Sequence, residues 1–137
     1  MTPSILAKQA EVPLFTVRYY TRIGLLKPTR DSHNGYKIYQ PSDETRLRFI
    51  IAAKELGFTL AEIAEILGEA RDGNSPCPMV REIVSRRIEE NRRKIADMKK
   101  LQKKMEKALS SWSSMENSMP DGRSVCHLIE SVAESEE

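Results

Sequence analysis

The sequence predicts a mainly α-helical protein in which a winged helix-turn-helix precedes a long helix that pairs, as an antiparallel coiled coil, with a second copy of the chain. Three observations predict this class. Two short helical segments near the start are joined by a turn, an Asn-Gly pair precedes an alternating run at 36–39, and apolar residues recur every three or four positions from Val80 to Trp112. Hydrophobic residues make up only 39% of the 137 residues. A chain with so few apolar residues is expected to complete its hydrophobic core by packing against a second copy.

The segment 1–70 is predicted to be the winged helix-turn-helix domain. Its first two helices are expected over 4–10, capped by Ser4, and over 14–23. Gly24 is expected to end the second helix because glycine adopts a positive φ without steric cost. Two short helices joined by a turn of a few residues are typical of a helix-turn-helix.

The wing and two more helices complete that domain. The Asn34-Gly35 pair before alternating residues predicts a small β-hairpin, the wing. Ser42 is expected to cap the helix that follows it. Thr59, with Glu62 three residues later, forms the capping-box pattern at the start of the fourth helix.

The second half of the chain is predicted to be built for pairing. A linker rich in helix breakers covers 71–78, and a helix follows over 79–112, roughly 50 Å long at 1.5 Å per residue. Its apolar seam is narrow and carries Asn91, a polar residue of the kind that sets register in coiled coils. We therefore expect a homodimer, followed over 113–137 by a loop and an acidic tail whose end, from 133, is expected to be disordered.

Charge is distributed unevenly along the chain, although the net charge is only +2. Residues 1–40 carry a net +4 and residues 72–110 a net +5, whereas residues 111–137 carry a net −5. The basic first segment can face phosphates, while the acidic tail is repelled by them. The basic residues of the long helix are expected to form a solvated exterior interleaved with acids, in preference to a second nucleic-acid surface.

Several function classes are excluded by what the sequence lacks. No nucleophile, base and orienting residue occur together as in a catalytic site, and no glycine-rich phosphate loop is present, so we expect no enzyme activity. No apolar run approaches the ~20 residues that span a bilayer, and no signal peptide opens the chain. Two cysteines do not make a disulfide framework, which favours a reducing cytoplasm.

Three motifs in register resemble the MerR family of bacterial transcription regulators. The run TVRYYTRIGLL at 16–26 resembles that family's recognition-helix signature, NGYKIY at 34–39 its wing, and ELGFTLAEI at 55–63 the junction of its next two helices. The resemblance covers nearly the whole chain. Two departures concern base preference: the stretch 12–15 lacks the family's usual Ser or Thr cap, and Thr21 replaces a usual acid.

The resemblance implies double-stranded promoter DNA as a partner. Arginine can hold guanine or phosphate in a bidentate contact, and tyrosine can donate to a phosphate oxygen. Tyr20 is expected to be the inward member of the adjacent tyrosine pair. The expected DNA contacts are Thr16, Arg18, Tyr19 and Arg22 on the recognition helix and Tyr36 and Lys37 on the wing.

Cys77 and Cys126 are the candidate effector ligands, with His127 as a third donor. The first cysteine precedes the long helix and the second follows it, so antiparallel pairing would bring Cys77 of one copy to Cys126 of the other. The resemblance implies that the loop after the helix holds the effector, and that a Cys at the first position favours a soft divalent ion of the zinc, mercury, cadmium or lead class. The Cys that metal sensors of the family place at the helix end is missing, since Trp112 is followed there by two serines.

The resemblance also implies a mechanism, and alternatives remain open beside it. The dimer would bind between promoter elements that are too far apart, and effector binding would distort the DNA so that RNA polymerase engages both. The alternatives are redox-active or structural cysteines, the same fold with an organic effector, a coiled-coil adaptor without DNA binding, and a cytosolic metal chaperone.

Overall fold

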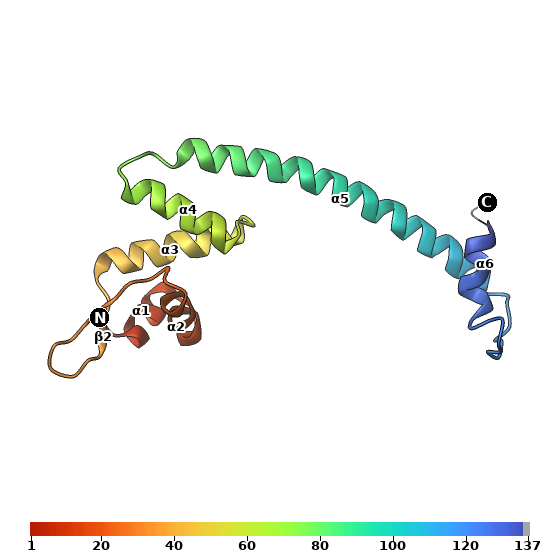
Figure 1. Cartoon of the computed structure of the whole chain (residues 1–137), viewed down its shortest axis with the longest axis horizontal. Coiled ribbons are helices and arrows are strands. Elements are labelled where there is room, and N and C mark those ends of the chain that lie inside the picture. Colours follow the sequence, from red (N-terminus) through yellow and green to blue (C-terminus); the bar gives the residue numbers. More distant parts are fainter. Residues whose placement is uncertain (136–137) are drawn as a thin grey trace. The chain divides into compact units, whose positions relative to one another are not determined.

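The computed structural model describes residues 1–135, and its elements follow the predicted order (Figure 1). The described residues form two compact units, and the boundary between them lies between Val80 and Arg81. Along the chain the elements are α1 (Pro3–Ala10), α2 (Leu14–Arg22), β1 (Thr29–Arg30), β2 (Lys37–Ile38), α3 (Pro41–Glu55), α4 (Leu60–Arg71), α5 (Cys77–Trp112) and α6 (His127–Ser135).

The first unit is a small helical core with a wing. Helix α1 packs on α2 and α3, and α3 packs on α4 (Figure 1). The turn between α1 and α2 is closed by Glu11, which has a left-handed backbone with φ 58° and donates its N–H to the carbonyl of Lys8. The largest fully buried side chains all come from this unit: Leu6, Val17, Leu26, Tyr39, Leu47, Ile50, Ile63 and Ile66.

Two of the three expected helix caps are wrong, and proline is the reason in both. Thr2, rather than Ser4, caps α1 through its side chain, because Pro3 occupies the first helical position. Gln40, rather than Ser42, is the N-cap of α3, again because a proline begins the helix. A proline at that position loses no hydrogen bond, since the first N–H groups of a helix have no partner within it.

The capping box at the start of α4 is confirmed. The backbone N–H of Thr59 donates to the Glu62 carboxylate at 2.8 Å, and the N–H of Glu62 donates to the Thr59 hydroxyl at 3.1 Å. The expected end of α2 is confirmed as well, since Gly24 follows the helix with φ 88°.

The wing is a two-stranded antiparallel ribbon closed by a longer turn than the Asn-Gly pair alone predicts. Thr29 pairs with Ile38, and Arg30 pairs with Lys37. In the loop between the strands, the Asp31 carboxylate accepts hydrogen bonds from two backbone N–H groups, those of His33 at 2.7 Å and Asn34 at 3.2 Å. Asp31 therefore shapes the loop and Gly35, at φ 71°, completes it.

The long helix begins two residues earlier than expected. The structure starts α5 at Cys77, so this cysteine lies in the first helical turn and not in the linker. Pro78, read in the sequence as a breaker, is compatible with a first turn because its missing N–H is not needed there. The helix runs for 36 residues, about 54 Å.

The end of the described chain is more ordered than expected. Helix α6 continues to Ser135, whereas disorder was expected from 133; positions 136 and 137 lie outside the described residues. None of the helices in the described part of the chain is both long and apolar enough to cross a membrane.

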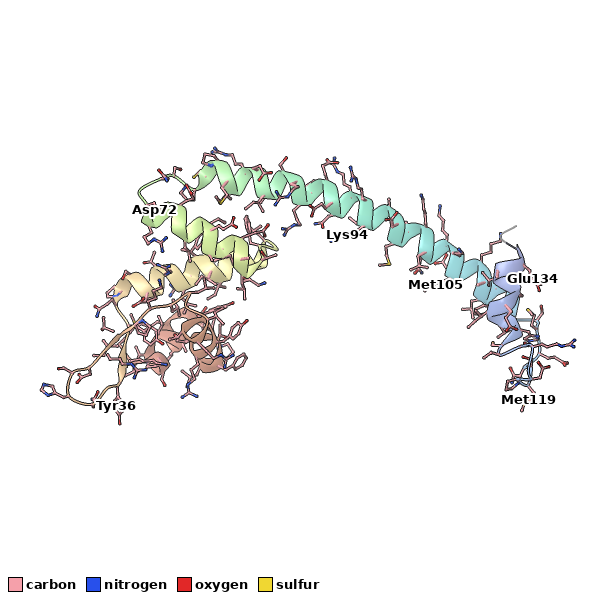
Figure 2. The ribbon with its side chains drawn as sticks, in the orientation of Figure 1. Tyr36, Asp72, Lys94, Met105, Met119 and Glu134 are labelled. Carbon is pink, nitrogen blue, oxygen red and sulfur yellow. The ribbon has the colours of Figure 1, made fainter. Side chains whose placement is uncertain are left out.

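The charged exterior expected for α5 is confirmed. Arginines pair with acids one turn away along the same helix: Arg86 lies 3.3 Å from Glu82, and Arg92 lies 2.6 Å from Glu89. The apolar seam, in contrast, is exposed, and Met105 projects from the helix with 58% of its surface accessible (Figure 2). The exposed seam residues are Ile88, Ile95, Met98, Leu101, Met105 and Leu109.

Candidate nucleic-acid interface and metal-binding residues

Helix α2 presents a polar stripe on the face opposite the core. Val17 is fully buried and fixes the orientation of the helix. Arg18, Tyr19 and Arg22 are exposed, and Arg22 lies four residues after Arg18 and three after Tyr19, the spacings that make side chains neighbours on a helix surface. Thr16, also expected on that face, is half-buried at its edge.

Aromatic stacking organises this stripe. The Arg22 guanidinium carbon lies 5.3 Å from the centre of the Tyr19 ring, within cation–π distance. The Tyr19 and Tyr20 ring centres are 5.6 Å apart. Tyr20 is the more buried of the two, as expected, and burial, followed by the proximity of Tyr19, raises its pKa above the ordinary value. The surroundings of Tyr20 thus favour its neutral phenol over the phenolate.

A hydrogen bond joins α2 to the base of the wing. The hydroxyl oxygens of Thr21 and Tyr39 are 2.6 Å apart, and the Thr21 hydroxyl donates to the carbonyl of Val17 at 2.8 Å. Since the Thr21 proton is used in that bond, the phenol of Tyr39 donates to Thr21. The residue that replaces the family's usual acid thus ties the recognition helix to the wing.

A basic notch lies between the end of α2 and the wing. It has a volume of about 330 Å³, and its lining includes three cations, Lys27, Arg30 and Lys37. Of these, only Lys37 was predicted as a DNA contact. The excess of basic residues in 1–40 was the available signal for the other two, but the spacing along the chain did not place them beside the helix.

Tyr36, the second expected wing contact, is 73% exposed and points away from the helices (Figure 2). Its backbone N–H donates to the Asn34 side-chain oxygen at 2.9 Å, which fixes the loop around it.

The N-terminus of α2 has Pro13 at its cap position, with no side-chain cap and no acid in the first turn. Because no side chain caps the first N–H groups of α2 and no acid repels an anion there, the N-terminus of this helix is available to a phosphate group.

The two cysteines belong to different units, and neither forms a disulfide. Cys77 is exposed in the first turn of α5, and Cys126 is half-buried directly before α6. Within residues 1–135 of the single chain, no three His, Cys, Asp or Glu side chains are grouped to hold a metal ion.

His127 is held in a defined tautomer. Its Nε2 lies 2.6 Å from the Glu116 carbonyl oxygen, which can only accept, so Nε2 carries a proton, and in the neutral imidazole Nδ1 is then the nitrogen with the lone pair. Metal-ligating histidines characteristically donate their other N–H in this way.

The same loop is tied to α6 by Glu130. Its carboxylate accepts hydrogen bonds from the Ser124 hydroxyl at 2.5 Å and from the Val125 N–H at 2.9 Å. The bond from Ser124, followed by that from Val125, lowers the pKa of Glu130. These contacts hold the residues preceding Cys126 in place.

Two protein-family models match this chain. The model described as MerR HTH family regulatory protein matches residues 1–70, and the model described as MerR, DNA binding matches residues 44–108. The chain belongs to the MerR family. It is accordingly a DNA-binding transcription regulator and not an enzyme.

Individual relatives of this MerR protein include metal regulators. The mercuric resistance operon regulatory protein of Bacillus cereus is 36% identical over 98 residues, which are 72% of this chain and 74% of that protein. The transcriptional regulator HmrR of Rhizobium leguminosarum is 30% identical over 128 residues, 93% of this chain and 94% of that protein. The lead(II) complex of PbrR691 from Ralstonia metallidurans superposes with a TM-score of 0.76 at 25% identity, covering 96% of this chain and 98% of that one.

MerR regulators act at promoters as homodimers together with RNA polymerase, and structures with DNA occur among the similar folds. The mainly helical fold with its long helix, predicted from the sequence, is confirmed by these comparisons.

Proposed function

We propose that this MerR protein is a metal-responsive transcription activator that binds a soft divalent ion and then distorts its promoter. The proposal is carried by one combination in a single chain: a basic stripe on α2, and two free thiols, one in the first turn of the long helix α5 and one after its end. The relatives that regulate mercuric resistance or bind lead(II) support the effector class.

The DNA contacts are assigned to both parts of the first unit. Arg18 and Arg22 reach base edges or phosphates in the major groove, and Tyr19 orients Arg22 by stacking. Thr16 approaches from the edge of the stripe. Tyr36 and Lys37 contact the backbone from the wing, which positions the protein without reading sequence.

A second copy completes the second unit. The seam residues of α5 are exposed and form an apolar stripe, and at its C-terminal end Leu101 and Met105 line a hollow together with Val132 of α6. Trp112, at the end of that seam, has a buried indole N–H without a hydrogen-bond partner in the described chain. A buried donor without a partner is costly, so its partner is expected from the second copy or from a bound molecule.

The available donors suit a soft ion. Two thiolates, from Cys77 of one copy and Cys126 of the other, with the Nδ1 of His127, would provide three ligands per site. Thiolate and imidazole are the ligands of zinc and of softer ions, and three donors fall one short of the four of a structural zinc site. The donor set therefore favours an ion that accepts low coordination, of the mercury or lead type.

Metal binding would act through the conformational equilibrium of the dimer. An ion shifts that equilibrium only by binding one dimer conformation more tightly than the other. The favoured conformation bends and untwists the promoter, at a deformation cost that the contacts at two half-sites offset.

The test is transcription in vitro from the protein's own promoter, with zinc, cadmium, lead(II) and mercury(II) added singly. At least one ion is expected to activate transcription. Cys77→Ser and Cys126→Ser should each reduce that activation at least tenfold while leaving operator binding intact, whereas Ser114→Ala, close to the helix end, serves as the matched control. Normal activation by either cysteine variant would contradict the metal site.

A second candidate, the same fold with an organic effector, is favoured by one observation. Next to the unpaired Trp112 indole lies a groove of about 320 Å³ between α5 and α6, lined also by Ser111, Met115 and Ser131. Trp112 is the only tryptophan of the chain, so quenching of its fluorescence by organic molecules, in a dimer with both cysteines replaced by serine, would favour this candidate.

A further inference from the structure

Phe15 is the most prominent apolar side chain on the first unit's helix-turn-helix. It is the second residue of α2, and 71% of its surface is exposed. Its neighbours on either side of the sequence differ from it: Leu14 and Thr16 are half-buried, and Val17 is fully buried. The inward face of the helix is thus occupied by other residues, and Phe15 is directed outward by the register.

The register places Phe15 on the same face as the basic stripe. Arg18 lies three residues after it, Tyr19 four and Arg22 seven, the spacings of one helical face. Phe15 occupies the N-terminal end of that face. In helix-turn-helix proteins the N-terminal residues of the second helix are those that contact base edges in the major groove.

We propose that Phe15 recognises the 5-methyl group of a thymine and is a specificity-determining residue for operator binding. The inference rests on the proposed DNA contacts of α2 and adds a base to them. Along the edges of the base pairs in the major groove, the thymine methyl is the apolar group, and phenylalanine is among the side chains that contact it.

The charges around Phe15 select DNA as the occupant of this surface. The first turn of α2 contains no acid, and Arg18 and Arg22 follow on the same face. The basic notch of Lys27, Arg30 and Lys37 begins at the other end of the helix. With cations after it on the same face of the helix, Phe15 can face the base edges of a major groove while the cations pair with the phosphates that border the groove.

The experiment uses the full-length dimer and a duplex that it selects from a random pool. Each thymine of that duplex is replaced in turn by deoxyuridine, which removes only the methyl group. Binding of the wild-type protein is expected to weaken roughly three- to fivefold at one thymine per half-site, the effect of losing one buried methyl group. Phe15→Ala should weaken binding to the thymine duplex by a similar factor and lose all sensitivity to that replacement.

Two further variants separate the inference from general effects. Phe15→Leu keeps an apolar group and should retain part of the thymine preference, and Ile5→Ala removes an exposed apolar side chain of α1 and should leave it unchanged. Because Phe15 is exposed, the melting temperature of both Phe15 variants is expected to match that of the wild type.

The outcomes distinguish this inference from the proposed function. Selection of no sequence by the wild-type protein would overturn both. Two outcomes would overturn the thymine contact alone. The wild-type protein could select a sequence and yet bind every deoxyuridine duplex as tightly as the thymine duplex, or a deoxyuridine replacement could weaken binding by Phe15→Ala as much as it weakens binding by the wild type.

Discussion

The phenol of Tyr39 donates a hydrogen bond to the hydroxyl of Thr21 over 2.6 Å, and through it the base of the wing is attached to the recognition helix. Tyr39 is 1% exposed, so its hydroxyl has little access to water. The two elements proposed to contact DNA, α2 and the wing, are therefore connected through these two side chains.

The first prediction concerns this bond. Thr21→Val leaves the Tyr39 hydroxyl buried without an acceptor and should lower the free energy of unfolding by about 1–3 kcal/mol. Tyr39→Phe removes the polar group itself and should cost less. Urea unfolding of both single variants and the double variant measures the coupling; strictly additive effects would show that the bond contributes nothing.

The second prediction concerns the turn between α1 and α2. Glu11 is the non-glycine residue with a positive φ, 58°, in the described part of the chain. The left-handed conformation costs a residue with a Cβ about 1 kcal/mol, so Glu11→Gly should raise the free energy of unfolding by up to that amount. Lys8→Gly, inside α1, is the control and should lower it, because glycine weakens a helix interior. Thermal unfolding measures both.

The third prediction separates sequence reading from phosphate binding. Lys27→Ala and Lys37→Ala should weaken binding equally on all duplexes, and each should reduce the slope of log affinity against log salt by about one. Arg18→Ala should in addition relax the sequence preference. Arg93→Ala, an exposed arginine of α5, is the control and should change neither property. If neither lysine variant changed the slope of log affinity against log salt, the notch would not be part of the DNA interface.

The fourth prediction concerns the seam of α5. Ile95, 55% exposed, lies on the seam, whereas its neighbour Ala96 faces another side of the helix. Ile95→Glu should convert the dimer into monomers because it places a charge in the apolar contact. Ala96→Glu adds the same charge one residue later and should leave the dimer intact. Light scattering after size exclusion measures the mass, and equal behaviour of the two variants would argue against this seam.

The fifth prediction concerns the loop that precedes Cys126. Hydrogen bonds from Ser124 and Val125 lower the pKa of Glu130, so its contribution to loop stability is present above the ordinary carboxyl pKa and is lost as the pH falls through the lowered value. The amide resonance of Val125 should therefore remain unchanged on acidification until the pH is below the usual glutamate range.

Glu130→Gln removes the charged acceptor, and the Val125 amide should then exchange faster at neutral pH than in the wild type. Glu134→Gln, an exposed acid of the same helix, is the matched control. Equal exchange in the two variants would show that Glu130 does not hold the loop.

Proline explains most of what local sequence rules missed. Ser4 and Ser42 match the residue types that cap helices, but Pro3 and Pro41 each begin a helix ahead of them. Pro78 likewise belongs to the first turn of α5 and not to the linker. In all three cases the proline lies in the first helical turn, where its missing N–H costs no hydrogen bond, and the sequence pattern had placed the start of the helix after it.

The sequence by itself determined the class, because that depends on short-range periodicity and turn chemistry. The apolar period identified α2, α5 and the seam, the Asn-Gly pair identified the wing, and three motifs in register identified the family. The outward direction of Arg18 and Arg22 follows from the same helical period.

Only the tertiary structure decided which residues meet across the chain. Thr21 and Tyr39 are 18 residues apart, and Lys27, Arg30 and Lys37 face one notch only because the strands fold back beside α2. The outward position of Phe15 also required the packed core, since a phenylalanine beside Leu14 is equally suited to burial. Such contacts depend on the path of the chain between elements, which local propensity does not specify.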